Sequence, residues 1–266
     1  MGFPAARSLA LVVAHPDDDA YGVAGSIALH GDEAGFRYTL VHASYGEAGD
    51  IAPGFPATRE TLGAIRREEC ENAWRAHGRV PDRHDWLEYS DGGVAEVPFS
   101  ELVDRIAGIL DDERPLVVAT FGPDGITGHP DHVTIGRATD EAFHRVRSRG
   151  GPGLQRLVHG AIRESTMLRW NAARIRHGLP PWDPQRVYHL RGVPDYLRDI
   201  EVNTTTVAHR IVAGLKQHRS QAHVIFDSNR TDEDWLRSVG REPMIIAWPL
   251  RPPDAPRLAD IFEGLD

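Results

Sequence analysis

Short apolar runs recur along the first half of the chain. The runs at 9–14 (LALVVA) and 116–120 (LVVAT) show no alternation of polar and apolar positions, which is typical of strands buried on both faces of a sheet. The same pattern predicts strands at Tyr38–Ala43 and Leu157–Ile162, and a weaker one at Asp85–Tyr89.

Stretches with helical periodicity separate these runs. Thr58–His77 carries apolar residues on one broad face, and Ser100–Asp112 begins with a serine, Ser100, that suits a helix N-cap. The stretch His129–Arg147 opens with Pro130, a residue type favoured at the first helical position. Alternating strands and helices predict an α/β fold in which helices flank a mostly parallel sheet.

The last third of the chain follows this alternation less closely. An i, i+4 apolar stripe predicts a helix over Asn203–His218. Trp170–Tyr196 is rich in aromatic side chains, which we expect to pack in the core rather than to stack on a sugar or acyl group. We expect one domain over residues 1–266, with a core at about 8–147 and an elaborated C-terminal part at about 148–266.

Composition narrows the possible chemistry. The chain has 266 residues, 30 Lys and Arg against 39 Asp and Glu, and one cysteine beside 14 histidines. One cysteine excludes cysteine-rich zinc sites, so histidine and carboxylate would have to hold any metal. The net charge of −9 argues against nucleic acid as a partner, and no apolar run approaches the ~20 residues of a membrane span. We expect a cytoplasmic protein without a signal peptide or membrane insertion; a homo-oligomer is compatible with the sequence.

Two polar clusters follow predicted strands. HPDDD at 15–19 comes directly after the first run, and HPDH at 129–132 follows the run at 116–120 through a glycine-rich loop. Ligands bind open α/β sheets beyond the carboxyl ends of the strands, where the strand order reverses. If the two strands are neighbours at that point, both clusters meet in one crevice.

A three-ligand metal site fits these clusters. Catalytic zinc takes three ligands from histidine and carboxylate and keeps one position open for water. His15 and Asp18 can face one point across a proline turn, and His132 lies on the same side of its helix as His129. We assign His15, Asp18 and His132 as ligands of one Zn²⁺ per chain, which leaves Asp17 free as a base and His129 as a nearby cation.

The motifs together resemble those of the LmbE/PIG-L family of zinc-dependent de-N-acetylases. The resemblance rests on AHPDDD at 14–19, GEAG at 46–49, Arg66-x-x-Glu69 on a helix and GPDGITGHPDH at 122–132, and it covers roughly residues 8–147. It implies a Rossmann-like sheet and particular site residues. These are the metal ligands His15, Asp18 and His132, the general base Asp17, the oxyanion-side His129, and Asp131 as the acid that tunes that histidine.

The expected reaction removes an N-acetyl or other N-acyl group from an amino sugar or its conjugate. Bound zinc lowers the pKa of water toward ~7 and polarises the amide carbonyl. Asp17 accepts the water proton as general base, and zinc with a protonated His129 stabilises the oxyanion. The proton then returns to the leaving amine from Asp17 or from His129.

Three further residues are candidate substrate contacts. Arg66 matches an arginine that the family points at substrate, Glu47 lies in a glycine-rich loop at the crevice, and His218 continues an apolar stripe. Each has a plainer interpretation, a solvated charge for Arg66 and Glu47 and a hydrogen-bonded core histidine for His218. Asp19 could contest Asp18 as a ligand, but we expect it to cap the following helix.

Two alternatives stand beside this hypothesis. Thr127 occupies a position where the mycothiol-related branch has a tyrosine, which weakens the case for a mycothiol S-conjugate amidase. A non-hydrolytic Rossmann-type protein that binds a nucleotide or sugar is the alternative from another class. It would carry Gly-x-Gly-x-x-Gly after the first strand, where this chain has HPDDD.

Overall fold

A seven-stranded sheet forms the centre of the molecule in the computed structural model, which describes residues 7–226 and 230–265. The strand order is β3-β2-β1-β4-β5-β7-β6. The first five strands pair in parallel, while β7 pairs antiparallel with both β5 and β6, so the predicted mostly parallel α/β sheet is confirmed. The strands are β1 Ser8–Val13, β2 Arg37–His42, β3 Arg83–Trp86, β4 Val117–Phe121, β5 Arg156–Gly160, β6 Ile200–Asn203 and β7 Arg241–Trp248.

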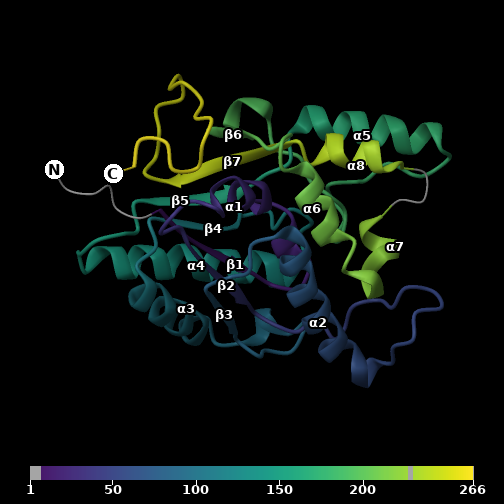
Figure 1. The fold of residues 1–266 in the computed structure, drawn as a ribbon, viewed down its shortest axis with the longest axis horizontal. Coiled ribbons are helices and arrows are strands. Elements are labelled where there is room, and N and C mark those ends of the chain that lie inside the picture. The colour runs from purple at the N-terminus through teal and green to yellow at the C-terminus, as the bar shows by residue number, and fades with distance from the viewer. Residues whose placement is uncertain (1–6, 227–229, 266) are drawn as a thin grey trace.

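Helices cover both faces of this sheet (Figure 1). α1, α2 and α6 pack against one face, and α3 and α4 lie side by side on the other. Within the described ranges, none of the helices combines the length and apolar character that crossing a bilayer requires. The α-helices are α1 Ala24–His30, α2 Arg59–His77, α3 Phe99–Glu113, α4 Pro130–Ser148, α5 Glu164–Arg176, α6 Ala208–Leu215, α7 Ala222–Ile225 and α8 Asp232–Ser238.

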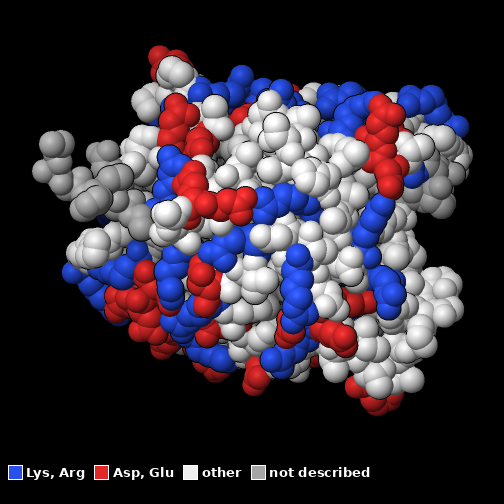
Figure 2. All heavy atoms as spheres, viewed as in Figure 1, with Lys and Arg blue, Asp and Glu red and all other residues white. Residues whose placement is uncertain are grey.

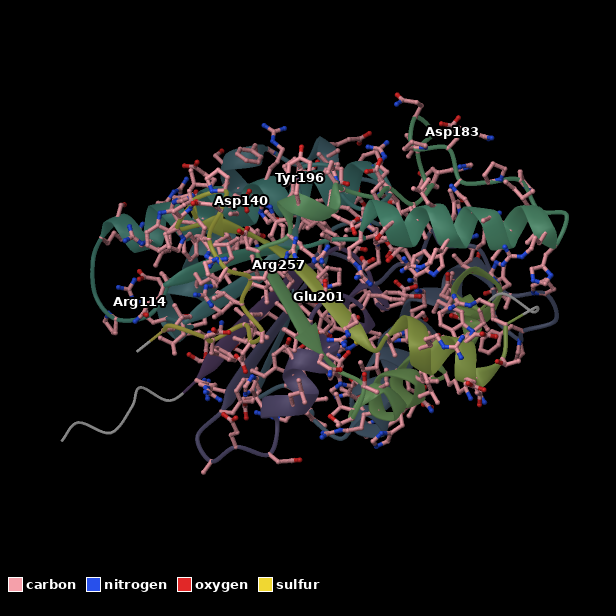
Figure 3. The ribbon with its side chains drawn as sticks, turned by 90° about the horizontal axis from the view of Figure 1, so that it is seen from above. Arg114, Asp140, Asp183, Tyr196, Glu201 and Arg257 are labelled. Carbon is pink, nitrogen blue, oxygen red and sulfur yellow. The ribbon has the colours of Figure 1, made fainter. Side chains whose placement is uncertain are left out.

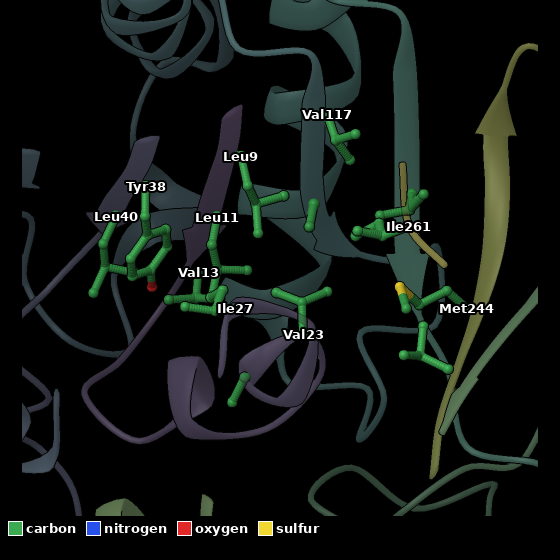
Figure 4. Close-up of a cluster of buried hydrophobic side chains, with 14 of the residues drawn as sticks. Leu9, Leu11, Val13, Val23, Ile27, Tyr38, Leu40, Val117, Met244 and Ile261 are labelled. Atoms are coloured by element: carbon green, nitrogen blue, oxygen red, sulfur yellow. The ribbon is translucent and has the colours of Figure 1, made fainter. Parts of the chain in front are cut away.

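β1 lies between two hydrophobic clusters. Leu11 and Val13 lie beside Ile27 of α1 in one cluster (Figure 4), whereas Ala10 and Val12 pack with α3 and α4 in the other. Both faces of the strand are therefore buried, which accounts for an apolar run without alternation.

Element boundaries differ from the predictions where the chain makes tertiary contacts. α3 begins at Phe99 after Pro98, so Ser100 lies inside the first turn and is not the N-cap. The helix predicted over 203–218 is shorter, because Ile200–Asn203 pairs with β7 as strand β6 and the helix starts only at Ala208. Tertiary pairing overrides the helical periodicity at that end.

The aromatic residues between 170 and 196 do not all enter the core. Tyr188 is 68% exposed and Tyr196 is 76% exposed, so core packing was the wrong expectation for both. The physical reason is that α5 lies at the rim of the molecule and buries only Met167. Figure 3 shows the loop around Asp183 projecting beyond this helix.

The strand order reverses between β1 and β4. From β1 the chain continues through β2 to β3 on one side, and from β4 it continues to β5 on the other. β1 and β4 pair in parallel with Leu9 opposite Val117, so their carboxyl ends lie at the same edge. The two polar clusters of the sequence therefore follow adjacent strands at the reversal point, where α/β sheets bind ligands.

Candidate metal centre

The turn after β1 separates the roles of two consecutive aspartates. The carboxylate of Asp18 accepts a hydrogen bond from the His15 amide at 2.8 Å, which folds the turn back on itself. Asp17 has φ +121°, a rare conformation for a residue other than glycine, and its carboxylate pairs with Arg66. Adjacent acids thus face different partners, as the spacing predicted.

The first turn of α4 fixes a second pair of side chains. Pro130 is the first helical residue, as predicted, and the rings of His129 and His132 stack at 4.8 Å and 14°. Phe121 stacks on His132 at 4.2 Å, and Nδ1 of His132 lies 3.0 Å from the Gly125 carbonyl. A proton on Nδ1 for that carbonyl leaves the Nε2 lone pair of His132 free to bind a metal.

The ligand atoms of His15, Asp18 and His132 lie close together, and we call them the ligand triangle, with the two carboxylate oxygens of Asp18 sharing one corner. His15 Nδ1 lies 3.2 Å from His132 Nε2 and 3.3 Å from Asp18 Oδ2, and His132 Nε2 lies 3.4 Å from Asp18 Oδ1. Metal bonds of about 2.0–2.1 Å in a tetrahedron place ligand atoms roughly 3.3–3.4 Å apart. The donor set and its spacing therefore fit a tetrahedral divalent ion with one position open.

Two carboxylates contact Nε2 of His15, the ring nitrogen that is not part of the ligand triangle. His15 Nε2 lies 3.0 Å from Asp91 and 3.3 Å from Asp131. The Asp131 carboxylate also accepts the amides of Gly92 at 2.8 Å and Val94 at 3.2 Å. A histidine that donates one ring N–H to a carboxylate is oriented and made more basic as a metal ligand.

Asp131 therefore contacts a different histidine from the one the resemblance implied. Its carboxylate lies on His15, and only its main-chain N–H reaches His129, donating to Nδ1 at 3.1 Å. Asp91 was missed in the sequence because it lies in an irregular loop after β3. The signal that could have found it is its position, since β3 ends at the same edge of the sheet.

The charges around His15 compensate one another. Although burial opposes its protonation, the carboxylates of Asp131, Asp18 and Asp91 raise the pKa of His15 well above its usual value. Burial likewise opposes ionisation of Asp18, yet His132 and His15 hold the pKa of that carboxyl below its usual range. Carboxylates that favour a positive charge on His15 would also favour a bound cation at this place.

Arg66 lies beneath the candidate base. Its side chain is only 4% exposed, so the alternative of a solvated charge is wrong. It donates to the carbonyls of Pro16 at 2.6 Å and Gly46 at 2.7 Å, and to Asp17 Oδ2 at 3.1 Å. Burial raises the pKa of Asp17 to about 7 although Arg66 opposes the shift. The arginine orients the candidate base.

Glu47 and His218, two of the candidate substrate contacts, make no polar contact with the three ligand residues among the residues that the structure describes. Glu47 Oε1 accepts the amide of Asp91 at 2.9 Å, which ties the GEAG loop to the loop after β3. His218 is 1% exposed, both of its ring nitrogens lack a hydrogen-bond partner among the described residues, and burial lowers its pKa to about 4. Within the described ranges, neither forms a hydrogen bond or ion pair with the three ligand residues.

Asp19 faces away from the ligand triangle. It is fully buried, where its carboxylate lies 3.0 Å from Nε2 of His42 and accepts Trp74 Nε1–H at 2.5 Å. The expectation that Asp19 caps α1 was wrong. Glu242 does so instead, because its carboxylate accepts the amide of Ser26 at 2.9 Å in the first turn.

The His129 ring has a defined acceptor and a defined donor. Because Nδ1 accepts the Asp131 amide, a neutral ring carries its proton on Nε2. Burial, followed by the charges of His15 and His132, lowers the pKa of His129 to about 4. A neutral ring of this kind differs from the protonated histidine expected from the sequence, and its one N–H is on Nε2. The centre of the Tyr188 ring lies 5.1 Å from the centre of the His129 ring, with the two rings nearly perpendicular.

Comparison with known proteins assigns the family. A family model described as PIG-L, GlcNAc-PI de-N-acetylase, matches residues 10–143. The chain belongs to the PIG-L family. The matched residues contain the whole ligand triangle with Asp17 and Arg66, while Tyr188 lies outside them.

Curated PIG-L relatives resemble this chain over most of its length. A 1D-myo-inositol 2-acetamido-2-deoxy-alpha-D-glucopyranoside deacetylase from Saccharomonospora viridis is 31% identical over 237 residues, which cover 80% of this chain and 84% of the relative. A probable N-acetyl-alpha-D-glucosaminyl L-malate deacetylase 2 from Bacillus cereus is 32% identical over 228 residues, 83% of this chain and 86% of the relative. These relatives are deacetylases, which act on amides.

A solved structure shares the PIG-L fold over nearly the whole chain. The 4-carboxy-2-hydroxymuconate hydratase from Pseudomonas putida KT2440 superposes with a TM-score of 0.62 at 17% identity, covering 95% of this chain and all of that one. At this identity the likeness shows the fold alone, and that enzyme is named for a different reaction. The function must therefore be argued from the site residues and not from the fold.

Proposed function

We propose that this chain is a cytoplasmic, zinc-dependent hydrolase that removes an N-acetyl group from an amino sugar or an amino-sugar conjugate. The observation that carries the proposal is the ligand triangle of His15, Asp18 and His132, with the partly buried carboxylate of Asp17 beside it. The deacetylase relatives support the reaction class, and their names support a small N-acetylated amino sugar as substrate.

Zinc would be held by these three residues, with Asp91 and Asp131 orienting His15. When bound, the ion lowers the pKa of a coordinated water toward ~7 and polarises the amide carbonyl. Two histidines and one carboxylate with an open position form the donor set of catalytic zinc.

The remaining steps belong to residues of the chain. Asp17, fixed by Arg66, accepts the proton of the attacking water, a general-base contribution typically of ~10²–10⁴-fold. His129 donates from Nε2 to the oxygen that becomes negative, where one donor is worth roughly 3–4 kcal/mol. Asp17 then holds the proton that the leaving amine requires.

The experiment measures amine released from N-acetylglucosaminides by the zinc-loaded protein and by Asp17→Asn. We expect the substitution to lower kcat by about 10²–10⁴-fold while zinc content stays at one ion per chain. Asp254→Asn, an acid in an exposed turn, is the control and should behave like wild type. A protein that binds no divalent metal, or an Asp17→Asn variant with wild-type kcat, contradicts the proposal.

The same assay addresses the amidase alternative. Substrates that carry acetyl or a bulky acyl group on the same amino sugar distinguish a deacetylase from an amidase of the mycothiol S-conjugate kind. We expect the acetyl substrate to have the higher kcat/KM.

A further inference from the structure

A segment far along the chain lies against the glycine-rich loop that leads to His129. The amide of Tyr188 donates to the Thr127 carbonyl at 2.9 Å, and the amide of Arg191 donates to the Ile126 carbonyl at 2.7 Å. We call residues 188–191 the strap. Two residues beyond it, Val193 donates to the Ile162 carbonyl at 2.8 Å, so main-chain bonds fix the strap beside the loop that leads to His129.

The strap places a guanidinium directly over Gly128. A Cβ on Gly128 would overlap Nη2 of Arg191, so the glycine provides the space that this side chain occupies. Gly128 also has φ +71°, a conformation that suits glycine. The guanidinium therefore lies against the residue that precedes His129.

Among the residues that the structure describes, the charge of Arg191 has no acidic partner. Figure 2 shows acidic and basic side chains next to one another over the viewed face, and Arg163 and Arg198 both pair with Glu201. Among the described residues, no carboxylate lies within 4.0 Å of Arg191. Within the described part of the chain, its Nε is buried without an acceptor, and Nη1 makes only a long contact of 3.5 Å to the carbonyl of Asp124.

A role in pinning the loop does not require this charge. The main-chain bonds of the strap already hold residues 126 and 127, and a contact of 3.5 Å is at the limit of a hydrogen bond. A buried, unsatisfied donor on a cation is costly, which favours a site that an anion completes.

Tyr188 shows that the strap reaches the reacting region. The centres of the Tyr188 and His129 rings lie 5.1 Å apart in an edge-to-face arrangement, although Tyr188 is 68% exposed. Its φ of +67° is strained for a bulky residue, and such strain persists where the surrounding structure imposes it, often at functional sites. The strap therefore forms one wall beside the candidate oxyanion donor.

We propose that Arg191 forms an anion subsite that binds a carboxylate or phosphate on the part of the substrate next to the amino sugar. The inference rests on the proposed function and specifies its substrate class, an N-acetylated amino sugar with an acidic aglycone. A guanidinium binds both oxyanions through paired N–H donors. The buried guanidinium of Arg66, which contacts the candidate base, is already occupied by Asp17.

The test compares matched substrates. Carboxymethyl N-acetyl-α-glucosaminide and its neutral carbamoylmethyl analogue have nearly the same shape, and N-acetylglucosamine 1-phosphate provides the phosphate arm. We expect wild type to favour the acidic probe by about 10- to 100-fold in kcat/KM. Arg191→Met should bring the ratio close to one while leaving the neutral probe within a factor of three, and Arg191→Lys should retain part of the preference.

Arg186→Met, which removes an exposed arginine of the same loop, is the control and should keep the wild-type ratio. Equal kcat/KM for acidic and neutral probes in wild type, or an equal loss on both in Arg191→Met, overturns the subsite. Thermal stabilisation by each probe is measured in parallel, because it reports binding without turnover. If no probe is hydrolysed, the proposed function fails, while an Arg191-dependent stabilisation by the acidic probes alone still supports the subsite.

Discussion

Replacing Arg66 tests how the candidate base is held. Nη2 of this buried side chain donates to the Pro16 carbonyl at 2.6 Å and to Asp17 Oδ2 at 3.1 Å, and Nη1 donates to the Gly46 carbonyl at 2.7 Å. One guanidinium thus joins α2, the turn after β1 and the loop after β2. Arg66→Met keeps an apolar stem of similar length and removes all three bonds.

The loss of folding free energy in Arg66→Met depends on which hydrogen-bond acceptors the substitution leaves without a donor. Gly46 O still accepts the amide of Gly49 at 3.2 Å, whereas no other hydrogen bond to Pro16 O is found in the described chain. An unsatisfied buried carbonyl costs about 1–3 kcal/mol, and a charged hydrogen bond such as that to Asp17 contributes about 1.5–3 kcal/mol. The sum is roughly 4 kcal/mol, which for 266 residues lowers Tm by roughly 7 °C.

Activity should fall together with stability. A base displaced by about 1 Å can cost ~10²-fold in rate, so we expect kcat of Arg66→Met to drop by that order while zinc content is unchanged. Thermal unfolding, metal analysis and steady-state kinetics measure the three quantities. Arg67→Met is the control, because Arg67 is half-exposed and its 3.9 Å ion pair with Glu71 contributes little.

One result would refute this reasoning about Arg66. If Arg66→Met had the wild-type Tm and only a higher KM, the arginine would contact substrate, as the family resemblance implied, and would not support Asp17. Arg66→Lys should lie between wild type and Arg66→Met, because an ammonium keeps the charge but lacks the fork that reaches three acceptors.

Two further predictions concern a metal-supporting residue and a pH-dependent contact. Asp91→Asn, which weakens the hold on His15, should lower zinc affinity by about 10- to 100-fold, measured by chelator competition; unchanged affinity contradicts this role. Although burial opposes it, Asp260 and Glu33 raise the pKa of His30. Its charged contacts therefore stabilise the fold fully below pH 6.5, the unfolded value, and this stabilisation is lost as pH rises through the raised pKa. The Tm difference between wild type and His30→Gln should thus be larger at pH 6 than at pH 9, and a pH-independent difference would refute it.

The candidate metal ligands could be located in the sequence because each cluster is local. His15 and Asp18 lie in one turn, His132 lies in the first turn of one helix, and both clusters directly follow strands with a clear apolar pattern. Ligand binding where the strand order reverses requires these two strands to be neighbours, and the structure shows that β1 pairs with β4.

Residues supplied by irregular segments could not be predicted in this way. Asp91 and Arg191 lie in loops without periodicity, and their positions depend on contacts between distant parts of the chain. The role of Arg66 depended on burial, which an amphipathic helix does not reveal at a charged position. β6 was missed because its pairing with β7 outweighs the local pattern around Asn203.

The contact between the strap and the glycine-rich loop before His129 has an evolutionary consequence. The amides of Tyr188 and Arg191 bond to the main-chain carbonyls of residues 127 and 126, so the joint depends on backbone geometry and not on which side chains the strap carries. A strap of different sequence could be grafted onto the same loop without disturbing the metal ligands. Selection for a new substrate can therefore act on this short stretch while the hydrolytic machinery, encoded upstream of it, is left intact.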